Sequence, residues 1–200
     1  MSSFYKKVRA VLKPIIKVLF RVKCVGAENV PSEGAVLLCS NHTSLFDIPL
    51  LIALCPRQIF FMAKKEIFKV PILGSVVKAM GAFPVDRGAR DISAIRNALS
   101  VVKENKVLGI FPEGTRYRKC GPMREVKTGS AFVIAKTGVD MVPVSIYKEG
   151  VAHPFRRVTV RFGEPVPAKA LCDGKPTKEN LNEASRVIND SINKMWELKF

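Results

Sequence analysis

The pattern of apolar and polar positions along the chain predicts strands that alternate with helices. Continuous apolar runs, typical of strands buried on both faces, occupy residues 35–39, 59–62, 107–111, 141–147 and 158–162. Helical spacing predicts helices over residues 48–54, 91–103, 130–136 and 177–198, with Asp91 as the N-cap of the second. This alternation predicts an α/β fold: a single-domain layered structure in which helices flank a mostly parallel, twisted sheet.

A further helix is predicted at the N-terminus, over residues 4–22. Its apolar positions recur at helical spacing: Phe4, Val8, Val11, Leu12, Ile15, Leu19 and Val22. Its polar positions are cationic: Lys6, Arg9, Lys13, Lys17 and Arg21. Pro14 is expected to kink this helix or to divide it into two short pieces. The sequence therefore predicts a basic amphipathic helix at residues 1–23 and a main domain at residues 24–200.

The charge of the N-terminal helix indicates what it contacts. Residues 1–23 contain seven Lys or Arg and no acidic residue. Such a helix suits an anionic membrane surface, with apolar side chains among acyl chains and cations over lipid phosphates. The alternative is that its apolar stripe packs onto the main domain, although a packing helix normally carries acids too. Because lysines interrupt every apolar run, we expect neither a signal peptide nor a membrane span, and hence peripheral attachment.

Composition extends this picture to the whole chain. The 33 Lys and Arg against 17 Asp and Glu give a net charge of +16. That excess indicates an anionic partner, such as nucleic acid, anionic lipid, an acidic carrier protein or a phosphorylated metabolite, unless it is simply a solvated surface. The five cysteines lack Cys-x-x-Cys spacing, which argues against disulfides or zinc and favours a reducing cytoplasm. They are Cys24, Cys39, Cys55, Cys120 and Cys172.

Chemically capable residues gather where predicted strands end, which is where α/β sheets place their sites. The run from Asn41 to Asp47 follows the strand at 35–39 and contains His42. On one regular helix His42 and Asp47 would point about 140° apart, so their pairing requires His42 in a loop and Asp47 in the first helical turn. The carboxylate would there stay ionised, hold one imidazole N–H and leave the other nitrogen free as a base.

Two further clusters contain groups that bind phosphate. In residues 111–116, which end a predicted strand, Gly114 permits close backbone approach. Thr115 and Arg116 supply hydrogen-bond donors to a phosphate there, and arginine does so with two parallel bonds. Arg87, in a second cluster, either holds a phosphate or makes an internal ion pair.

Together these runs resemble the motifs of the glycerolipid acyltransferase family, typified by the lysophosphatidic acid (1-acylglycerol-3-phosphate) acyltransferases. The family's Asn-His-x4-Asp motif matches residues 41–47, and its Phe-Pro-Glu-Gly-Thr-Arg motif matches residues 111–116 at every position. A second motif is similar to residues 81–87, and a Val-Pro-Val-like motif corresponds to residues 142–144. The chain lacks the Walker glycine loop, Gly-x-Ser-x-Gly and metal-ligand spacing that mark common alternatives.

The resemblance implies transfer of a fatty acyl group from acyl-CoA or acyl-ACP to the sn-2 hydroxyl of lysophosphatidic acid. The product would be phosphatidic acid, for phospholipid biosynthesis at the cytoplasmic face of the cell membrane. His42 would remove the hydroxyl proton as the oxygen attacks the thioester carbonyl, and Asp47 would orient and stabilise the imidazolium. The reaction needs no acyl-enzyme, no metal and no cofactor beyond the acyl donor.

The resemblance also implies roles for residues that contact the substrate. The sequence does not identify the oxyanion donors, for which backbone amides near residues 41–44 are candidates. The side chains and turn implied to bind the acceptor are Arg87, Arg116 and Lys64, for its phosphate, and Glu113, Gly114 and Thr115, for its pocket.

Other readings of the sequence lead to different partners. A nucleic-acid-binding protein would interleave aromatic residues with cations, whereas Trp196 is the only tryptophan here, so no nucleic acid is expected. An acyltransferase of the same fold with a different lyso-lipid acceptor stays open, although a neutral acceptor would leave desolvated arginines unpaired. A thioesterase with Cys39 as nucleophile is disfavoured because Cys39 lies within a predicted strand.

Overall fold

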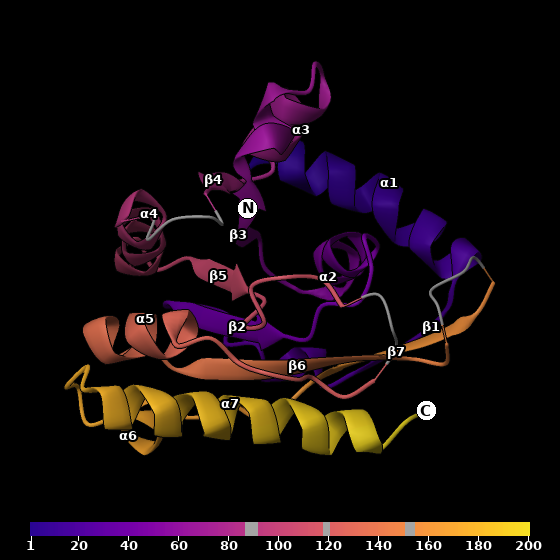
Figure 1. The fold of residues 1–200 in the computed structure, drawn as a ribbon. Helices are drawn as coiled ribbons and strands as arrows, with labels where there is room; N and C mark the ends of the chain where they lie inside the picture. The colour runs from indigo at the N-terminus through magenta and orange to yellow at the C-terminus, as the bar shows by residue number, and fades with distance from the viewer. Residues whose placement is uncertain (87–91, 118–120, 151–154) are drawn as a thin grey trace.

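A sheet of seven strands forms the centre of the part of the chain that the structure describes, with helices on both faces (Figure 1). The structure is a computed structural model and describes residues 1–86, 92–117, 121–150 and 155–200. The strand order across the sheet is β1-β7-β6-β2-β5-β3-β4. The predicted α/β fold with a mostly parallel sheet is thus confirmed.

The five strands expected from apolar runs are present as β2, β3, β5, β6 and β7. The bounds of all the strands are β1 (Arg21–Val25), β2 (Val36–Ser40), β3 (Ile59–Lys64), β4 (Phe83–Val85), β5 (Val107–Ile110), β6 (Met141–Lys148) and β7 (Arg157–Phe162). From β6 to β4 the neighbouring strands are parallel, whereas β7 is antiparallel to β6 and β1 is parallel to β7. The carboxyl ends of five strands therefore share one edge, where an α/β sheet places its site.

The helices connect these strands. Their bounds are α1 (Ser3–Leu19), α2 (Asp47–Leu54), α3 (Leu73–Ala79), α4 (Ile92–Lys103), α5 (Gly129–Thr137), α6 (Ala168–Leu171) and α7 (Lys178–Glu197), with two 3-10 helices, η1 (Ala27–Asn29) and η2 (Lys65–Lys69). The η2 and α3 helices, which the sequence did not predict, form the connection from β3 to β4. Asp91, the predicted N-cap of α4, lies outside the described residues.

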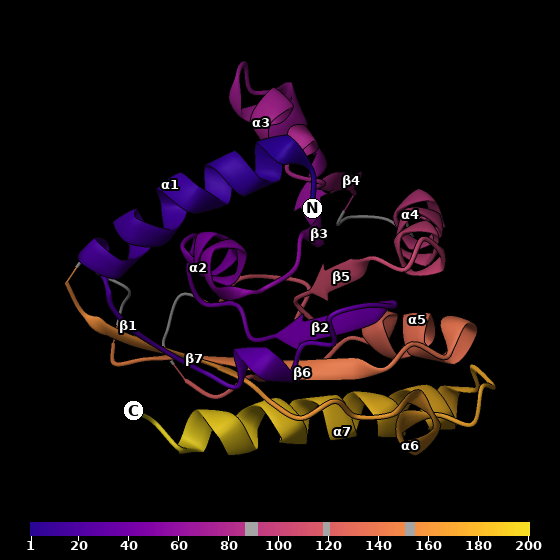
Figure 2. The ribbon, with the colours of Figure 1, turned by 180° about the vertical axis from the view of Figure 1, so that it is seen from behind.

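Two hydrophobic clusters lie on opposite faces of the sheet. Figures 1 and 2 show α1 and α2 on one face and α5, α6 and α7 on the other. Side chains of a strand alternate between its faces, so Leu38 of β2 joins the cluster under α1 and α2, whereas Leu37 joins the cluster under α5 and α7. Because β2 is buried on both faces, it reads as a continuous apolar run.

The N-terminal helix α1 both packs on the domain and exposes apolar side chains. The Ser2 side chain caps it by accepting a hydrogen bond from the Tyr5 N–H at 3.2 Å. It continues through Pro14, so the predicted division into two pieces is wrong. Pro14 lies on the exposed side, while Tyr5 before it and Ile16 after it are buried in one cluster that holds the helix together. Val11 and Val18 stay 63% and 73% exposed.

The predicted helix over residues 4–22 ends early, because residues 21–25 form the strand β1. The helical spacing of apolar residues carried the prediction too far, since β1 is a mostly exposed edge strand with no apolar run of its own. The division at residue 23 stays a prediction, and the structure places that residue inside β1. Among the described residues, none of the helices combines the length and the apolar character that crossing a bilayer requires.

Candidate active site

The shared carboxyl edge of the parallel strands brings together residues from four parts of the chain. Asn41 and His42 follow β2, the run Phe111–Arg116 follows β5, Lys64 ends β3 and Lys148 ends β6. Most of the residues that the sequence placed after strands therefore lie along one edge. Their side chains differ in whether they point into the site.

His42 and Asp47 lie against each other at this edge. The His42 Nδ1 atom is 3.0 Å from Asp47 Oδ2, and both side chains are buried. His42 lies in the loop after β2, and Asp47 is the first residue of α2, as the spacing required. With the proton on Nδ1 held by the carboxylate, Nε2 is the nitrogen with a lone pair for a substrate proton. The two residues thus form a base and its orienting acid.

The Asp47 carboxylate accepts more than the imidazole proton. Its Oδ2 atom accepts hydrogen bonds from the backbone N–H groups of Thr43 and Ser44, both at 2.7 Å. Its Oδ1 atom lies 2.7 Å from Lys148 Nζ. Burial alone would raise the pKa of the Asp47 carboxyl, but the bond from His42, the Lys148 charge and the backbone bond hold its pKa below the usual range. Asp47 is therefore an anion at neutral pH.

Lys148 is a site residue that the sequence analysis missed. It ends β6, and its side chain is only 2% exposed. A buried lysine is rare unless it is paired, and the partner here is Asp47. The available signal was a lysine directly at the end of the apolar run 141–147. The side chains of Lys148, Asp47 and His42 thus form a charged chain that leads from β6 to the imidazole.

Glu113 supports the His42 backbone. The Glu113 Oε2 atom accepts the His42 N–H at 2.8 Å, and the residue is 3% exposed. Burial raises the pKa of the Glu113 carboxyl to about 7, with a smaller rise from Asp47, against lowering bonds from the backbone of His42 and Arg124. The sequence predicted that Glu113 shapes a substrate pocket, whereas this carboxylate is turned towards the main chain.

Asn41 joins the loop to β6. Its side-chain N–H donates to the Ile146 carbonyl at 3.0 Å, and its oxygen accepts the Ile146 N–H at 2.8 Å. The amide therefore acts as a short strand partner for β6 beyond the end of β2. This pairing fixes the residue directly before His42.

A small cavity lies beside the imidazole. The His42 ring stacks on Phe111 with a centroid distance of 4.0 Å, and Phe111 stacks on Phe61. The cavity has a volume of about 110 Å³ and is lined by His42, Met62, Val85, Gly109, Ile110, Phe111 and Gly114. A Cβ at Gly109 would lie 2.4 Å from a Phe61 ring carbon, so this position has no room for a side chain. The wall is mostly apolar, which suits an acyl chain near the reacting group.

The predicted phosphate ligands are placed unequally. Arg116 is half-buried, next to Tyr117, whose N–H donates to the His42 carbonyl, and it has no ion pair with any described residue. The Lys64 side chain is 56% exposed and lies 3.5 Å from the Glu66 carboxylate. Arg87 lies outside the described residues. The structure therefore holds the backbone beside Arg116 against the His42 loop and leaves the Lys64 side chain largely exposed.

The turn at Gly114 carries a further cation. Gly114 has a φ of +67°, and a Cβ there would lie 3.1 Å from Lys127 Nζ. Thr115, the next residue, is exposed. Because Gly114 lines the cavity, the ammonium of Lys127 lies close to the cavity mouth. The sequence analysis assigned no role to Lys127.

The candidate oxyanion donors are wrong for three of the four residues. The N–H of His42 donates to Glu113, and those of Thr43 and Ser44 donate to Asp47. Each amide is thus turned towards a protein carboxylate, which is a stronger acceptor than a neutral carbonyl.

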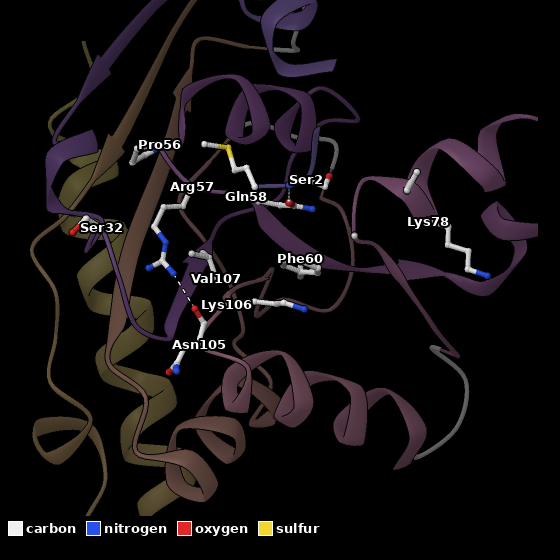
Figure 3. A pocket seen from close by; sticks show the side chains of 13 residues that line it. Ser2, Ser32, Pro56, Arg57, Gln58, Phe60, Lys78, Asn105, Lys106 and Val107 are labelled. Carbon is white, nitrogen blue, oxygen red and sulfur yellow. Dashed lines mark hydrogen bonds between the residues drawn. The ribbon is translucent and has the colours of Figure 1, made fainter. Parts of the chain in front are cut away.

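A larger hollow lies at the opposite edge of the sheet (Figure 3). It has a volume of about 760 Å³ and is lined by residues before β3 and β5, among them Arg57 and Lys106. Both terminal nitrogens of Arg57 are engaged, because they donate to four backbone carbonyls, including that of Asn105. Lys106 pairs with Glu104. Arg57 and Lys106 thus connect loops to one another. The cavity beside His42 is therefore the better candidate for an active site.

Fold and site together define the class of this protein, and the comparison with known families agrees. The profile of the family described as acyltransferase matches residues 21–147. The chain therefore belongs to the acyltransferase family, and the resemblance that the motifs indicated is confirmed.

The chain is also similar to individual proteins of this family. The chain is 30% identical over 202 residues to the 1-acyl-sn-glycerol-3-phosphate acyltransferase of Bacillus subtilis, with 96% of each chain covered. It is 33% identical over 186 residues to that of Saccharomyces cerevisiae, covering 86% of this chain and 58% of the relative. The crystal structure of the 1-acyl-sn-glycerophosphate (LPA) acyltransferase PlsC from Thermotoga maritima superposes with a TM-score of 0.78 at 27% identity, covering 97% of this chain and 78% of PlsC.

Proposed function

We propose that this protein transfers a fatty acyl group from an acyl thioester to the sn-2 hydroxyl of 1-acylglycerol-3-phosphate, giving phosphatidic acid. The observation that carries the proposal is the buried His42–Asp47 pair beside a mostly apolar cavity, at the strand edge that also bears Arg116. The names of the relatives support the same acceptor.

The two ring nitrogens of the imidazole have different roles in the proposed reaction. His42 Nε2 takes the proton of the acceptor hydroxyl while its oxygen bonds to the thioester carbonyl carbon. The tetrahedral intermediate then collapses, the carbon–sulfur bond breaks, and the imidazolium returns the proton to the departing thiolate. Asp47 stays ionised throughout and stabilises the imidazolium through Nδ1. The acyl group goes directly from sulfur to oxygen.

Charges at the cavity mouth orient the acceptor. Arg116, Lys127 and Lys64 surround the turn and the end of β3, and an anionic phosphate there would keep the adjacent glycerol hydroxyl near Nε2. Arg87 is expected to add to this group. Acyl-CoA and acyl carrier protein are both anionic, so the net charge of +16 suits either donor.

The membrane is the proposed source of the acceptor, with the protein on its cytoplasmic face. Phe4, Val11, Ile15 and Val18 form an exposed apolar strip on α1 beside its lysines. We propose that this strip lies among lipid acyl chains, while the other side of α1 packs on the domain.

The decisive test is turnover of lysophosphatidate by purified protein with a labelled acyl donor. His42→Ala removes the base and is expected to lower turnover by at least about 100-fold. Vesicle binding should be unchanged, because it does not involve the imidazole. Turnover at the wild-type rate would end the proposed mechanism, and no turnover of any acceptor by the wild type would end the proposed function.

Arg116→Ala tests the acceptor. We expect a higher KM for lysophosphatidate, by about tenfold or more, because a charge-assisted contact to phosphate is lost. Turnover of an uncharged monoacylglycerol should be affected far less. The matched control is Arg186→Ala, which removes an exposed arginine of α7 that is paired with Glu183 and Asp190. An unchanged preference for the phosphorylated acceptor would exclude Arg116 from phosphate binding.

A further inference from the structure

The connection between β3 and β4 carries an apolar surface that the proposed reaction does not use. It consists of η2 and α3, which project from the body of the molecule in Figure 1. Four large apolar side chains are exposed there: Val70, Ile72, Leu73 and Val76, with exposed fractions of 46%, 81%, 47% and 37%. We call these four residues the η2–α3 tip.

The η2–α3 tip is held in shape by close packing beneath it. Gly74 is buried, and a Cβ there would lie 2.3 Å from the Phe68 carbonyl oxygen. The Gly74 N–H donates to the Val70 carbonyl at 2.8 Å, and the Val76 N–H donates to the Ile72 carbonyl at 3.0 Å. The four side chains are therefore presented on folded backbone, so binding through them needs little further ordering.

Ile72 occupies a backbone conformation that isoleucine rarely adopts. Its φ is 64° and its ψ is −56°, and the Leu73 N–H donates to the Pro71 carbonyl at 2.7 Å. This is a γ-turn with positive φ, a strained type, and a β-branched residue fits it badly. Glycine would fit without strain. An isoleucine that is 81% exposed at such a position indicates a use for the side chain itself.

The charges around the tip define its partner. Residues 64–79 contain four lysines and one acid, Glu66, which lies 3.5 Å from Lys64. The other lysines of this stretch, Lys65, Lys69 and Lys78, are exposed. An apolar projection ringed by cations complements an anionic lipid surface, with acyl chains for the tip and phosphates for the lysines.

The tip is connected directly to the candidate active site. It joins β3, whose Met62 lines the cavity beside His42, to β4, whose Val85 lines the same cavity. Leu45, at the same edge of the sheet, is 74% exposed. We propose that the η2–α3 tip inserts among the acyl chains of an anionic bilayer and docks the His42 edge on the membrane. This inference rests on the proposed function in taking a lipid as the acceptor.

Vesicle binding tests the proposal independently of turnover. Ile72→Asp is compared with Ile92→Asp, because Ile92 on α4 is similarly exposed, at 68%. With phosphatidylglycerol–phosphatidylcholine vesicles, Ile72→Asp should lower the partition coefficient about tenfold or more, whereas Ile92→Asp should leave it unchanged. Equal partitioning of Ile72→Asp and wild type would overturn the proposal.

Ile72→Gly separates binding from stability. Glycine relieves the backbone strain, so the Tm should be no lower than that of the wild type, yet vesicle binding should weaken. Wild-type binding by this variant would exclude the side chain from lipid contact. With a short-chain lysophosphatidate that stays monomeric in water, turnover by both Ile72 variants should equal that of the wild type. Lower turnover there would place Ile72 in the substrate site instead.

The depth of insertion is measured by tryptophan fluorescence in the variants Ile72→Trp and Ile92→Trp. The native Trp196 contributes the same signal to both. Brominated acyl chains should quench the tryptophan at position 72 and not the one at position 92. Absence of quenching at both positions would contradict insertion, even if the protein binds the vesicles. A protein that binds and is quenched in this way but turns over no acceptor would refute the proposed function and leave the docking inference standing.

Discussion

At the scale of single residues, the Asp47 carboxylate is the point on which two chain segments converge, the loop before α2 and the end of β6. It takes contacts from the His42 loop, from Lys148 of β6 and from the backbone that enters α2. All of these contacts favour the ionised carboxylate. Asp47 has no exposed surface, so water does not compete for them. The orientation of the imidazole therefore depends on a charge that burial by itself would not tolerate.

Replacement of Lys148 tests this balance. Lys148→Met leaves the buried Asp47 anion with one charged partner fewer, and we expect a stability loss of about 3 to 5 kcal/mol. Lys148→Arg keeps the charge and should lose less. The control Lys106→Met breaks the exposed pair with Glu104 and should cost about 1 kcal/mol or less. Urea unfolding of the three variants checks this order, and equal losses for Lys148→Met and Lys106→Met would contradict it.

The Glu113 carboxyl is expected to make folding stability depend on pH in the direction opposite to that of the Asp47 carboxyl. The pKa of its carboxyl is raised from 4.5 to about 7 in the folded protein. Between these values the unfolded chain releases a proton that the folded chain keeps, so this group lowers stability as pH rises through the window. Glu113→Gln removes that loss. The Tm of the variant relative to wild type should therefore rise between about pH 4.5 and pH 7, and a falling difference would contradict the assignment.

The residue scale also shows what sequence spacing can and cannot predict. His42 and Asp47 are local to one another, so their pairing followed from a loop and a helix start. Lys148 lies 101 residues from Asp47, and only the pairing of β6 with β2 brings the two together. The oxyanion donors failed for a related reason, because the direction of a backbone N–H depends on acceptors such as Glu113 that are distant in sequence.

At the scale of elements, α1 has two different apolar sides. One side, with Tyr5 and Ile16, is part of the core, and the other, with Val11 and Val18, faces outward. The sequence analysis posed membrane contact and packing on the domain as alternatives. The structure gives one side of α1 to packing and leaves the other available for the proposed membrane contact.

The cations of α1 should determine its affinity for anionic vesicles. The triple variant Lys6→Glu, Lys13→Glu and Lys17→Glu is expected to weaken binding by about 100-fold or more, since each lost cation contributes about 1 kcal/mol and each glutamate adds repulsion. The control reverses three exposed lysines of α6, of α7 and of the segment between them, which are Lys169, Lys178 and Lys175. It has the same net charge. Flotation with phosphatidylglycerol vesicles compares the two, and equal binding would mean that only total charge matters.

Elements with weak internal patterns escaped the sequence analysis. The strand β1 has no apolar run of its own, and the apolar residues of η2 and α3 are interrupted by Pro71 and Gly74 and stay largely exposed. The five predicted strands, by contrast, are covered on one or both faces, which is what gives them continuous apolar runs. Burial is thus the property that the strand patterns report, and β1, η2 and α3 were found only in the structure.

At the scale of the whole molecule, one edge of the sheet carries the candidate active site, and the surfaces beside it carry the proposed lipid contacts. The layer order and the mostly parallel sheet were predictable from the alternation of strands and helices. The reversed direction of β7 and β1 was not predictable, since the hydrophobic pattern of a strand does not depend on its direction in the sheet. The net charge of +16 acts over the entire surface, and we propose that the tip and α1 determine where that charge meets a membrane.

The two edge strands of the sheet, β1 and β4, bear on how copies of the protein would behave when packed side by side on a membrane surface. β1 presents exposed Arg21 and Lys23, and β4 spans three residues with Pro84 at its centre, which lacks an N–H. Neighbouring copies would meet either repelling cations or a strand too short and too poor in donors to extend. Dense packing on a leaflet should therefore leave each copy separate instead of seeding cross-strand aggregates.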